Sequence, residues 1–307
     1  MNRLTWLTFA FLLVSACSLP DHSTTSRVVS TFDDPYLAGM DGAPKEAQIS
    51  YAYIDSQGNM LHARDAQVVM HAASLMKVAV MVEVFRQIDA GTFTLEDKIP
   101  VTNSFRSVID GSTYSVTRDD DSDDVVHTWV GGMATVEDLL EHMITRSSNL
   151  ATNVLLEAVT AASVQSTLRG LGITMMEVRR GVEDGKAFAA GVNNVTTAHD
   201  MARLFVSIAQ NRAASRASCD RMIGILSRQT FRAGIPRGIP LGSRVANKTG
   251  SITRHAHDVA LIIPKDSPMY VLAVLTRGFD RGEDAEAAIA RVAATIAKIH
   301  TSQYAPR

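Results

Sequence analysis

Short apolar runs near both ends of the chain predict β-strands. From Gln48 to Ile54 the residues alternate in character, a turn follows at Asp55–Gly58, and a second short run comes after it, which is the pattern of a β-hairpin. Three more runs of strand length lie far along the chain, at Arg244–Asn247, Val259–Ile263 and Tyr270–Leu275. We therefore expect five strands, two from the beginning of the folded body and three from its end.

Between these two groups of strands the apolar residues recur at helical spacing. The stretch Ser74–Ile88 has this period and ends before Gly91, and Asp284–Ile299 has it again after the last strand. Two capping-box patterns mark the starts of further helices, Thr135 with Asp138 and Thr197 with Asp200. The middle of the chain is therefore expected to be mostly helical.

This order of elements predicts an α/β fold of the α+β kind. One antiparallel, five-stranded sheet is built from both chain ends and flanked by helices, and an all-helical lobe is inserted between its strands. We expect a single domain over residues 46–303, with a sheet lobe at about 46–68 and 241–303 and a helical lobe at about 69–240.

The first residues predict export. A basic start precedes an apolar run, Leu4–Ala16, which is too short to span a bilayer and is typical of a signal peptide over residues 1–16. The run ends in small residues before Cys17, which resembles a bacterial lipobox; ordinary cleavage after Ala16 is the alternative. Residues 17–45 are rich in Ser, Thr, Asp, Gly and Pro and are expected to form a tether. We expect a periplasmic, membrane-anchored lipoprotein.

The composition and charge of the chain exclude some classes of function. With 307 residues, 46% of them hydrophobic, and a formal net charge of −2, the chain is globular and has no general electrostatic grip on nucleic acid. The acidic run Arg118–Asp124 lacks the spacing of a calcium loop and is expected to be a solvated loop. If Cys17 is lipidated, Cys219 has no partner within the chain and is expected to be a buried apolar residue.

The first candidate chemistry is a serine followed three residues later by a lysine. If Ser74 begins a helix, Lys77 lies one turn on and on the same face, so its amine reaches the hydroxyl. An amine acts as a base only when it is neutral, and burial or a second nearby cation lowers the pKa of a lysine toward that state.

Two later patterns add binding groups. Ser147 and Asn149 follow an amphipathic stretch and offer a hydroxyl and a side-chain amide. Lys248, Thr249 and Gly250 follow a strand-like run. At a strand end such a lysine and threonine bind a carboxylate, and the glycine lets a substrate backbone approach closely.

The chain resembles the penicillin-recognising serine hydrolases, because it has the motifs S-x-x-K, S-x-N and K-T-G in that order. The strand–helix–strand layout resembles class A β-lactamases in particular. The stretch Arg232–Pro236 before Val245–Ser251, and Thr196-Thr197 before a helix, are also similar to that class. The resemblance covers about residues 48 to 300.

The resemblance implies an acyl-transfer site. Ser74 would be the acylated nucleophile, Lys77 a proton acceptor, and Ser147 a proton relay to the departing ring nitrogen. The remaining roles are in binding: Asn149 would hold the substrate's amide, Lys248 with Thr249 its carboxylate, and the backbone N–H groups of Ser74 and Ser251 the oxyanion.

Deacylation needs a second base, which class A enzymes place on a loop after S-x-N with an Asn four residues beyond it. Glu183 stands 36 residues after Ser147 in a polar segment, but the position of the Asn is occupied by Ala187. Either Glu183 holds the water alone, or Asn193 or Asn194 supplies the lost contact, or Glu183 is a surface carboxylate.

Two regions depart from the family pattern. Ser147 stands 73 positions after Ser74, a longer separation than the family pattern, so the sequence does not define the rim of the substrate cleft. The segment Ser251–Asp258 is less glycine-rich than in most class A enzymes, so that wall is expected to be bulkier. Arg254 or Arg277 could assist Lys248 with a carboxylate, or each could be a solvated arginine at a strand end.

No cofactor is implied. His255 and His257 share a strand face, but no third metal ligand clusters near them in the sequence, and no nucleotide-binding glycine motif is present. The leading hypothesis is a serine β-lactamase that acts on a small β-lactam or a peptidoglycan-derived substrate as a monomer. The alternatives are a cell-wall DD-peptidase or esterase of the same fold, or a penicillin-binding sensor that stays acylated.

Overall fold

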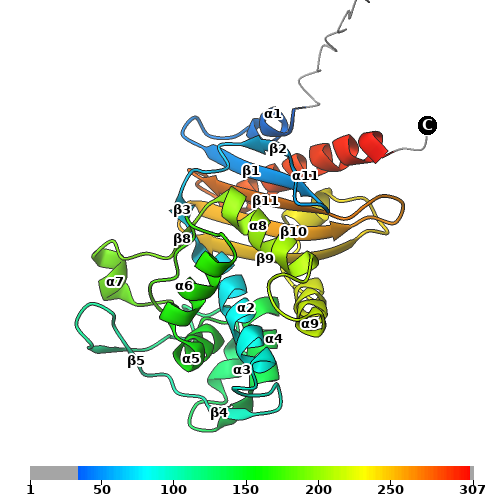
Figure 1. The fold of residues 1–307 in the computed structure, drawn as a ribbon. Helices are drawn as coiled ribbons and strands as arrows, with labels where there is room; N and C mark the ends of the chain where they lie inside the picture. The colour runs from blue at the N-terminus through cyan, green and yellow to red at the C-terminus, as the bar shows by residue number, and fades with distance from the viewer. Residues whose placement is uncertain (1–33, 305–307) are drawn as a thin grey trace, which may run out of the picture.

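The computed structural model describes residues 34–304. Its centre is a five-stranded antiparallel sheet whose strands follow the order β2-β1-β11-β10-β9 (Figure 1). The strands are β1 Gln48–Asp55, β2 Met60–Arg64, β9 Arg244–Ile252, β10 His255–Ile263 and β11 Tyr270–Arg277. The sheet predicted from the two chain ends is confirmed.

Helices cover both faces of this sheet. Figure 1 shows α8 (Ala198–Ala209) on one side and α11 (Gly282–Tyr304) on the other. Successive residues of β11 therefore alternate between two cores: Ala273 and Leu275 pack toward the helical lobe, whereas Leu272 and Val274 pack toward α11. Because both faces are covered, β11 is buried along almost its whole length.

Two strands are longer than the apolar pattern predicted. β9 continues through Lys248, Thr249 and Gly250 to Ile252, and β10 begins at His255. The K-T-G triplet therefore lies inside a strand and not at a strand end. Polar residues continue these strands because that part of the sheet faces the candidate site, so the apolar run stops before the strand does.

The inserted lobe is mostly helical and is built around α2 (Met76–Asp89), whose residues 76–85 are all buried. Its other helices are α3 Asp124–His127, α4 Val136–Thr145, α5 Asn149–Val159, α6 Ala161–Gly170, α7 Gly185–Ala189 and α9 Arg216–Ser227. The short helix α10, Ile235–Gly238, packs against α11 in the core of the sheet lobe, although it lies inside the range predicted for the helical lobe. Thr135 and Thr197 cap α4 and α8 as predicted, and Cys219 is buried.

The lobe also contains three short strand pairs that the sequence did not indicate. They are β3 Met70–His71 with β8 Val195–Thr196, β4 Lys98–Pro100 with β7 Met133–Thr135, and β5 Phe105–Arg106 with β6 Thr113–Tyr114. Strands of two or three residues are too short to leave a period in the sequence.

The N-terminal predictions have two different outcomes. The signal peptide and Cys17 lie outside the described residues. Part of the predicted tether belongs to the folded body, because α1 (Pro35–Met40) begins at an Asp34 cap and packs against α11. Gly39 makes this contact possible: a Cβ there would lie 2.6 Å from a methyl of Val292. Across residues 34–304, no helix combines the length and apolarity needed to span a bilayer.

Candidate active site

Ser74 lies on a tight turn before α2 and not within the helix itself. The turn is a 3₁₀ segment, Ala73–Leu75, and α2 begins at Met76. Lys77 is therefore on the first turn of α2, where it is fully buried. Ala73, directly before Ser74, has φ +46°, a left-handed conformation that alanine rarely adopts.

The Lys77 amine joins the first two motifs. Its Nζ donates to the carbonyl oxygen of Ser147 at 2.6 Å and to Oδ1 of Asn149 at 2.7 Å, and it lies 3.3 Å from the Ser147 hydroxyl. Burial lowers the pKa of Lys77 to about 7, although the charges of Asp121 and Glu183 oppose the shift. A substantial neutral fraction near pH 7 lets this amine accept a proton.

Lys248 brings the third motif to the same place. Its Nζ donates to the Ser147 hydroxyl at 2.9 Å and to the carbonyl oxygen of Thr249 at 2.7 Å. Burial lowers the pKa of Lys248, and the nearby Lys77 amine lowers it further. The Ser147 hydroxyl thus lies between two buried amines that come from opposite sides of the junction between the lobes.

Gly250 allows β9 to press against the nucleophile turn. A Cβ at this position would lie 3.1 Å from the backbone nitrogens of both Ser74 and Leu75. A side chain there would push the strand away from these N–H groups. This close approach brings Ser251 and Ser74 to the same cavity wall.

A cavity of about 510 Å³ opens where the three motifs meet. Seven of the predicted residues line it, namely Ser74, Ser147, Asn149, Glu183, Thr249, Gly250 and Ser251. A neighbouring cavity of about 530 Å³ shares four of them, Ser74, Asn149, Glu183 and Ser251. Lys77 and Lys248 are joined to this wall through Ser147, so the structure brings all nine predicted site residues together.

Glu183 reaches the site through Asn149. The Asn149 Nδ2 donates to Oε1 of Glu183 at 3.1 Å, while its Oδ1 accepts from Lys77. Partial burial raises the pKa of the Glu183 carboxyl, and the nearby Asp120 charge adds to the rise. A raised pKa makes this carboxylate a stronger base for a bound water.

Two asparagines hold the loop that carries Glu183: Asn153, which the sequence analysis missed, and Asn194, which was one of the two candidates to replace the missing Asn. Asn153, one turn along α5 from Asn149, makes two hydrogen bonds with the backbone of Val182, at 2.8 and 2.9 Å. Asn194 contacts the backbone of Arg179 and Arg180. A side-chain amide suits this task because it both donates and accepts.

The proposed substitutes for the missing Asn do not contact Glu183. Asn193 accepts from the Arg180 guanidinium at 3.0 Å, and Asn194 is occupied with backbone groups. Ala187 is buried inside α7. Within residues 34–304, the Glu183 carboxylate accepts a side-chain hydrogen bond from Asn149 alone.

The two candidate arginines lie elsewhere. Arg254 forms exposed ion pairs with Glu46 and Asp280, and Arg277 is exposed at the end of β11. Neither residue lines the two cavities. They are surface arginines in this structure, which is the simpler of the two interpretations given above.

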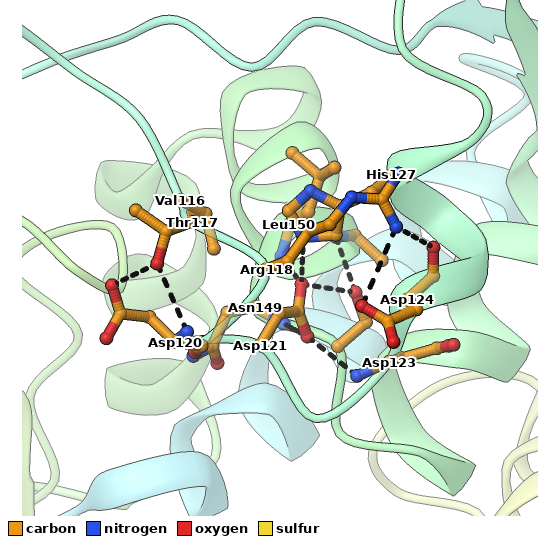
Figure 2. Close-up of polar contacts among 12 residues, drawn as sticks. Val116, Thr117, Arg118, Asp120, Asp121, Asp123, Asp124, His127, Asn149 and Leu150 are labelled. Carbon is orange, nitrogen blue, oxygen red and sulfur yellow. Dashed lines mark hydrogen bonds and ion pairs between the residues drawn. The ribbon is translucent and has the colours of Figure 1, made fainter.

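The acidic run is solvated only in part. Five of its residues are exposed as predicted, namely Arg118, Asp119, Asp120, Ser122 and Asp124. The side chains of Asp121 and Asp123 are buried, however, and Figure 2 shows Asp121 directed at the start of α5. Its carboxylate accepts from the backbone N–H groups of Asn149 and Leu150, each at 2.9 Å, and faces the His127 ring at 3.2 Å. Unpaired N–H groups at a helix start attract carboxylates, so Asp121 anchors the S-x-N motif.

Replacing Asp121 with asparagine is expected to lower the free energy of unfolding by about 1–2 kcal/mol, because the single amide oxygen cannot accept both N–H groups. Chemical denaturation of the purified variant measures this change. The exposed neighbour Asp119 provides the control, since Asp119→Asn removes the same charge and leaves the α5 contacts intact. Equal stability of the two variants would contradict the anchoring role.

The site lies at the junction of an antiparallel sheet and a helical lobe. It combines a serine before a buried lysine, a hydroxyl between two amines and a strand whose glycine allows close approach. This fold and site define a class A β-lactamase-like serine hydrolase. The match to a family model over residues 37–299 settles the membership: the chain belongs to the Beta-lactamase enzyme family. The match to the family model includes nearly all of the described residues.

Solved structures share the fold. A beta-lactamase from Sphaerobacter thermophilus superposes with a TM-score of 0.74 at 25% identity, covering 91% of this chain and 98% of its own. A beta lactamase from Xanthomonas campestris gives 0.74 at 21%, covering 87% and 98%. A mutant of PBP-A, solved as an acyl-enzyme complex with penicillin-G, gives 0.75 at 20%, covering 90% and 97%. No curated protein sequence matches the chain.

Proposed function

We propose that this protein is a serine β-lactamase, which opens the β-lactam amide through a covalent acyl-enzyme on Ser74. One observation carries the proposal: the Asn149 side chain joins the Lys77 amine to the Glu183 carboxylate. This contact, beside the cavity that Ser74 lines, supports a role for Lys77 as the base for acylation and for Glu183 as the base for deacylation.

Acylation begins when Ser74 Oγ attacks the lactam carbonyl carbon and its proton passes to the neutral amine of Lys77. The oxyanion that forms is held by the N–H groups of Ser74 and Ser251, whose approach depends on Gly250. When the C–N bond breaks, Ser147 gives its proton to the ring nitrogen and is reprotonated by an adjacent lysine ammonium. Lys248 and Thr249 hold the substrate's carboxylate.

Deacylation consumes one water. Glu183 accepts a proton from the water, whose oxygen attacks the acyl carbonyl. The ester bond to Ser74 then breaks as Oγ takes up the proton that Glu183 had accepted, which restores the free enzyme. The carboxylate needs no help from Asn193 or Asn194 in this scheme, because the Asn149 side chain orients it.

A second candidate is a DD-peptidase or esterase on the same scaffold. It is favoured by the buried Ala187 at the position where a second water ligand is expected, because a poorly held water would make deacylation slow. The likeness to PBP-A supports the shared fold alone.

A β-lactamase and a DD-peptidase can be distinguished by the product that each one releases. The wild-type protein is mixed in turn with a chromogenic cephalosporin and with a peptide ending in D-Ala-D-Ala, while ring opening and D-alanine release are followed. The β-lactamase proposal predicts many turnovers of the cephalosporin by each molecule. A single stoichiometric burst, with sustained release of D-alanine, would overturn it in favour of the peptidase.

We also propose that the protein is exported and anchored through a lipid on Cys17. The support is the apolar run that ends in small residues before this cysteine. Cys17→Ser is expected to move the protein from the membrane fraction to the soluble fraction of the cell envelope, as followed by immunoblot. Ser18→Ala, one residue on, should leave it in the membrane fraction. An unchanged distribution for Cys17→Ser would contradict lipidation.

A further inference from the structure

The backbone just before Ser74 is held in an unfavourable conformation. Ala73 has φ +46°, and a non-glycine residue keeps such an angle only where the surrounding contacts determine it. Two peptide groups lead into this residue, one joining His71 to Ala72 and one joining Ala72 to Ala73. What fixes these two groups also fixes the direction of the Ser74 hydroxyl and of its N–H.

All four polar atoms of these two peptide groups are hydrogen-bonded. In the first, the Ala72 N–H donates to the carbonyl oxygen of Asn194 at 2.8 Å, and the His71 carbonyl oxygen accepts from Nε2 of His257 at 3.0 Å. In the second, the Ala73 N–H donates to Nδ1 of His71 at 3.0 Å, and the Ala72 carbonyl oxygen accepts from the Leu75 N–H at 3.0 Å.

Two of these four bonds come from histidine rings, and their partners fix the tautomers. The backbone N–H of Thr276 donates to Nδ1 of His257 at 3.1 Å, so the proton of this ring is on Nε2 and is donated to His71. Likewise Nδ1 of His71 accepts from Ala73, which places its proton on Nε2, a buried atom without a hydrogen-bond partner.

Both rings remain neutral at ordinary pH. Burial lowers the pKa of His257 to about 4, and burial together with the nearby Arg180 and His255 lowers the pKa of His71 to about 4. Each ring therefore keeps the lone pair that its N–H partner requires. His257 is 2% exposed, and both of its nitrogens are occupied within the protein, so it offers no nitrogen to a substrate.

We propose that His257 and His71 are positioning residues for acylation: together they lock the backbone that presents Ser74. His257 lies on β10 opposite Gly250 of β9, so the same strand pair that forms the wall beside the oxyanion site also holds the nucleophile turn. This role deepens the proposed function and rests on it. It assigns to His257, which lines the cavity but has both ring nitrogens occupied, a task in presenting the nucleophile through the backbone.

The test compares two amide side chains of different length. In His257→Gln the amide nitrogen reaches the place of Nε2, so the hydrogen bond to the His71 carbonyl oxygen is kept. In His257→Asn the amide oxygen reaches the place of Nδ1, so only the hydrogen bond from the Thr276 N–H is kept. Both variants are made in the Glu183→Gln background, so that the rate of adduct formation with a penicillin is measured without deacylation.

The Asn variant is expected to acylate about 10-fold more slowly than the Gln variant at saturating penicillin, because one oriented hydrogen bond is lost, with little change in the half-saturating concentration. His300 provides the structural control: it is 1% exposed and bonds a carbonyl oxygen and a tyrosine hydroxyl far from the site. His300→Asn and His300→Gln should lower thermal stability and leave the acylation rate unchanged.

His71 gives a second pair of variants that does not depend on the fold surviving changes at β10. His71→Asn keeps an oxygen that accepts the N–H two residues on, whereas His71→Ala does not. We expect the Asn variant to acylate near the parent rate and the Ala variant about 10-fold more slowly. Equal rates within both pairs would overturn the positioning role. Failure of the parent Glu183→Gln protein to form any adduct would instead refute the proposed function.

Discussion

Replacing Ser74 with alanine is expected to lower the turnover of β-lactams by roughly 10⁴- to 10⁶-fold and to abolish any covalent adduct. The other groups of the site remain in Ser74→Ala, but the oxygen that forms the bond to the lactam carbonyl is gone. Lys77 and Lys248 would still be bridged by Ser147, so the variant separates loss of the nucleophile from loss of the site.

Intact-protein mass spectrometry and the chromogenic assay together measure this effect. Ser115→Ala is the matched control, because Ser115 is an exposed serine outside both cavities, and it should behave as wild type. An adduct of unchanged mass on Ser74→Ala would show that another residue is acylated. Ser147, the other cavity hydroxyl beside a lysine, would then be the first to examine.

Replacing Glu183 with glutamine is expected to slow deacylation by roughly 10²- to 10⁴-fold while acylation continues. The amide keeps the size of the side chain and a partner for Asn149, but it cannot accept the proton of the attacking water. Rapid-quench mass spectrometry should therefore show complete conversion to an adduct that persists for many wild-type turnover times.

A second glutamate that lines the same cavity provides the control. Glu286 comes from α11 and lines the cavity, and Glu286→Gln should clear the adduct as wild type does. The rate of deacylation, followed as decay of the wild-type adduct, should fall at acid pH with the protonation of Glu183, because the basic form of this carboxyl is lost as the pH falls through its raised pKa. Acylation should instead decline as the pH falls through about 7, where the Lys77 amine becomes protonated. Rapid clearance of the adduct by Glu183→Gln would remove this residue from the mechanism.

The sequence predicted the sheet and the site because both leave local marks. Strands covered on both faces require runs of apolar residues, as in Tyr270–Leu275. Polar residues such as Lys77 and Lys248 stand out because their spacing to a serine or a glycine is fixed by a helix turn or a strand. Glu183 could be singled out as a candidate, but its contact with Asn149 is visible only in three dimensions.

Features that depend on distant partners were missed. Nothing in the run Arg118–Asp124 indicates that Asp121 faces inward, because the N–H groups that donate hydrogen bonds to its carboxylate lie 28 and 29 residues further on. The same holds for His257, whose ring contacts a carbonyl oxygen 186 residues away. The predicted tether was too long for a similar reason, since α1 is stabilised by α11 at the far end of the chain.

A crystal structure of Glu183→Gln reacted with a penicillin would show which side chain is acylated. We expect continuous electron density from Ser74 Oγ to the opened lactam, with the acyl oxygen directed at the N–H groups of Ser74 and Ser251 and the carboxylate beside Lys248 and Thr249. A covalent bond to any other side chain, or an intact penicillin lying away from Ser74, would contradict this expectation.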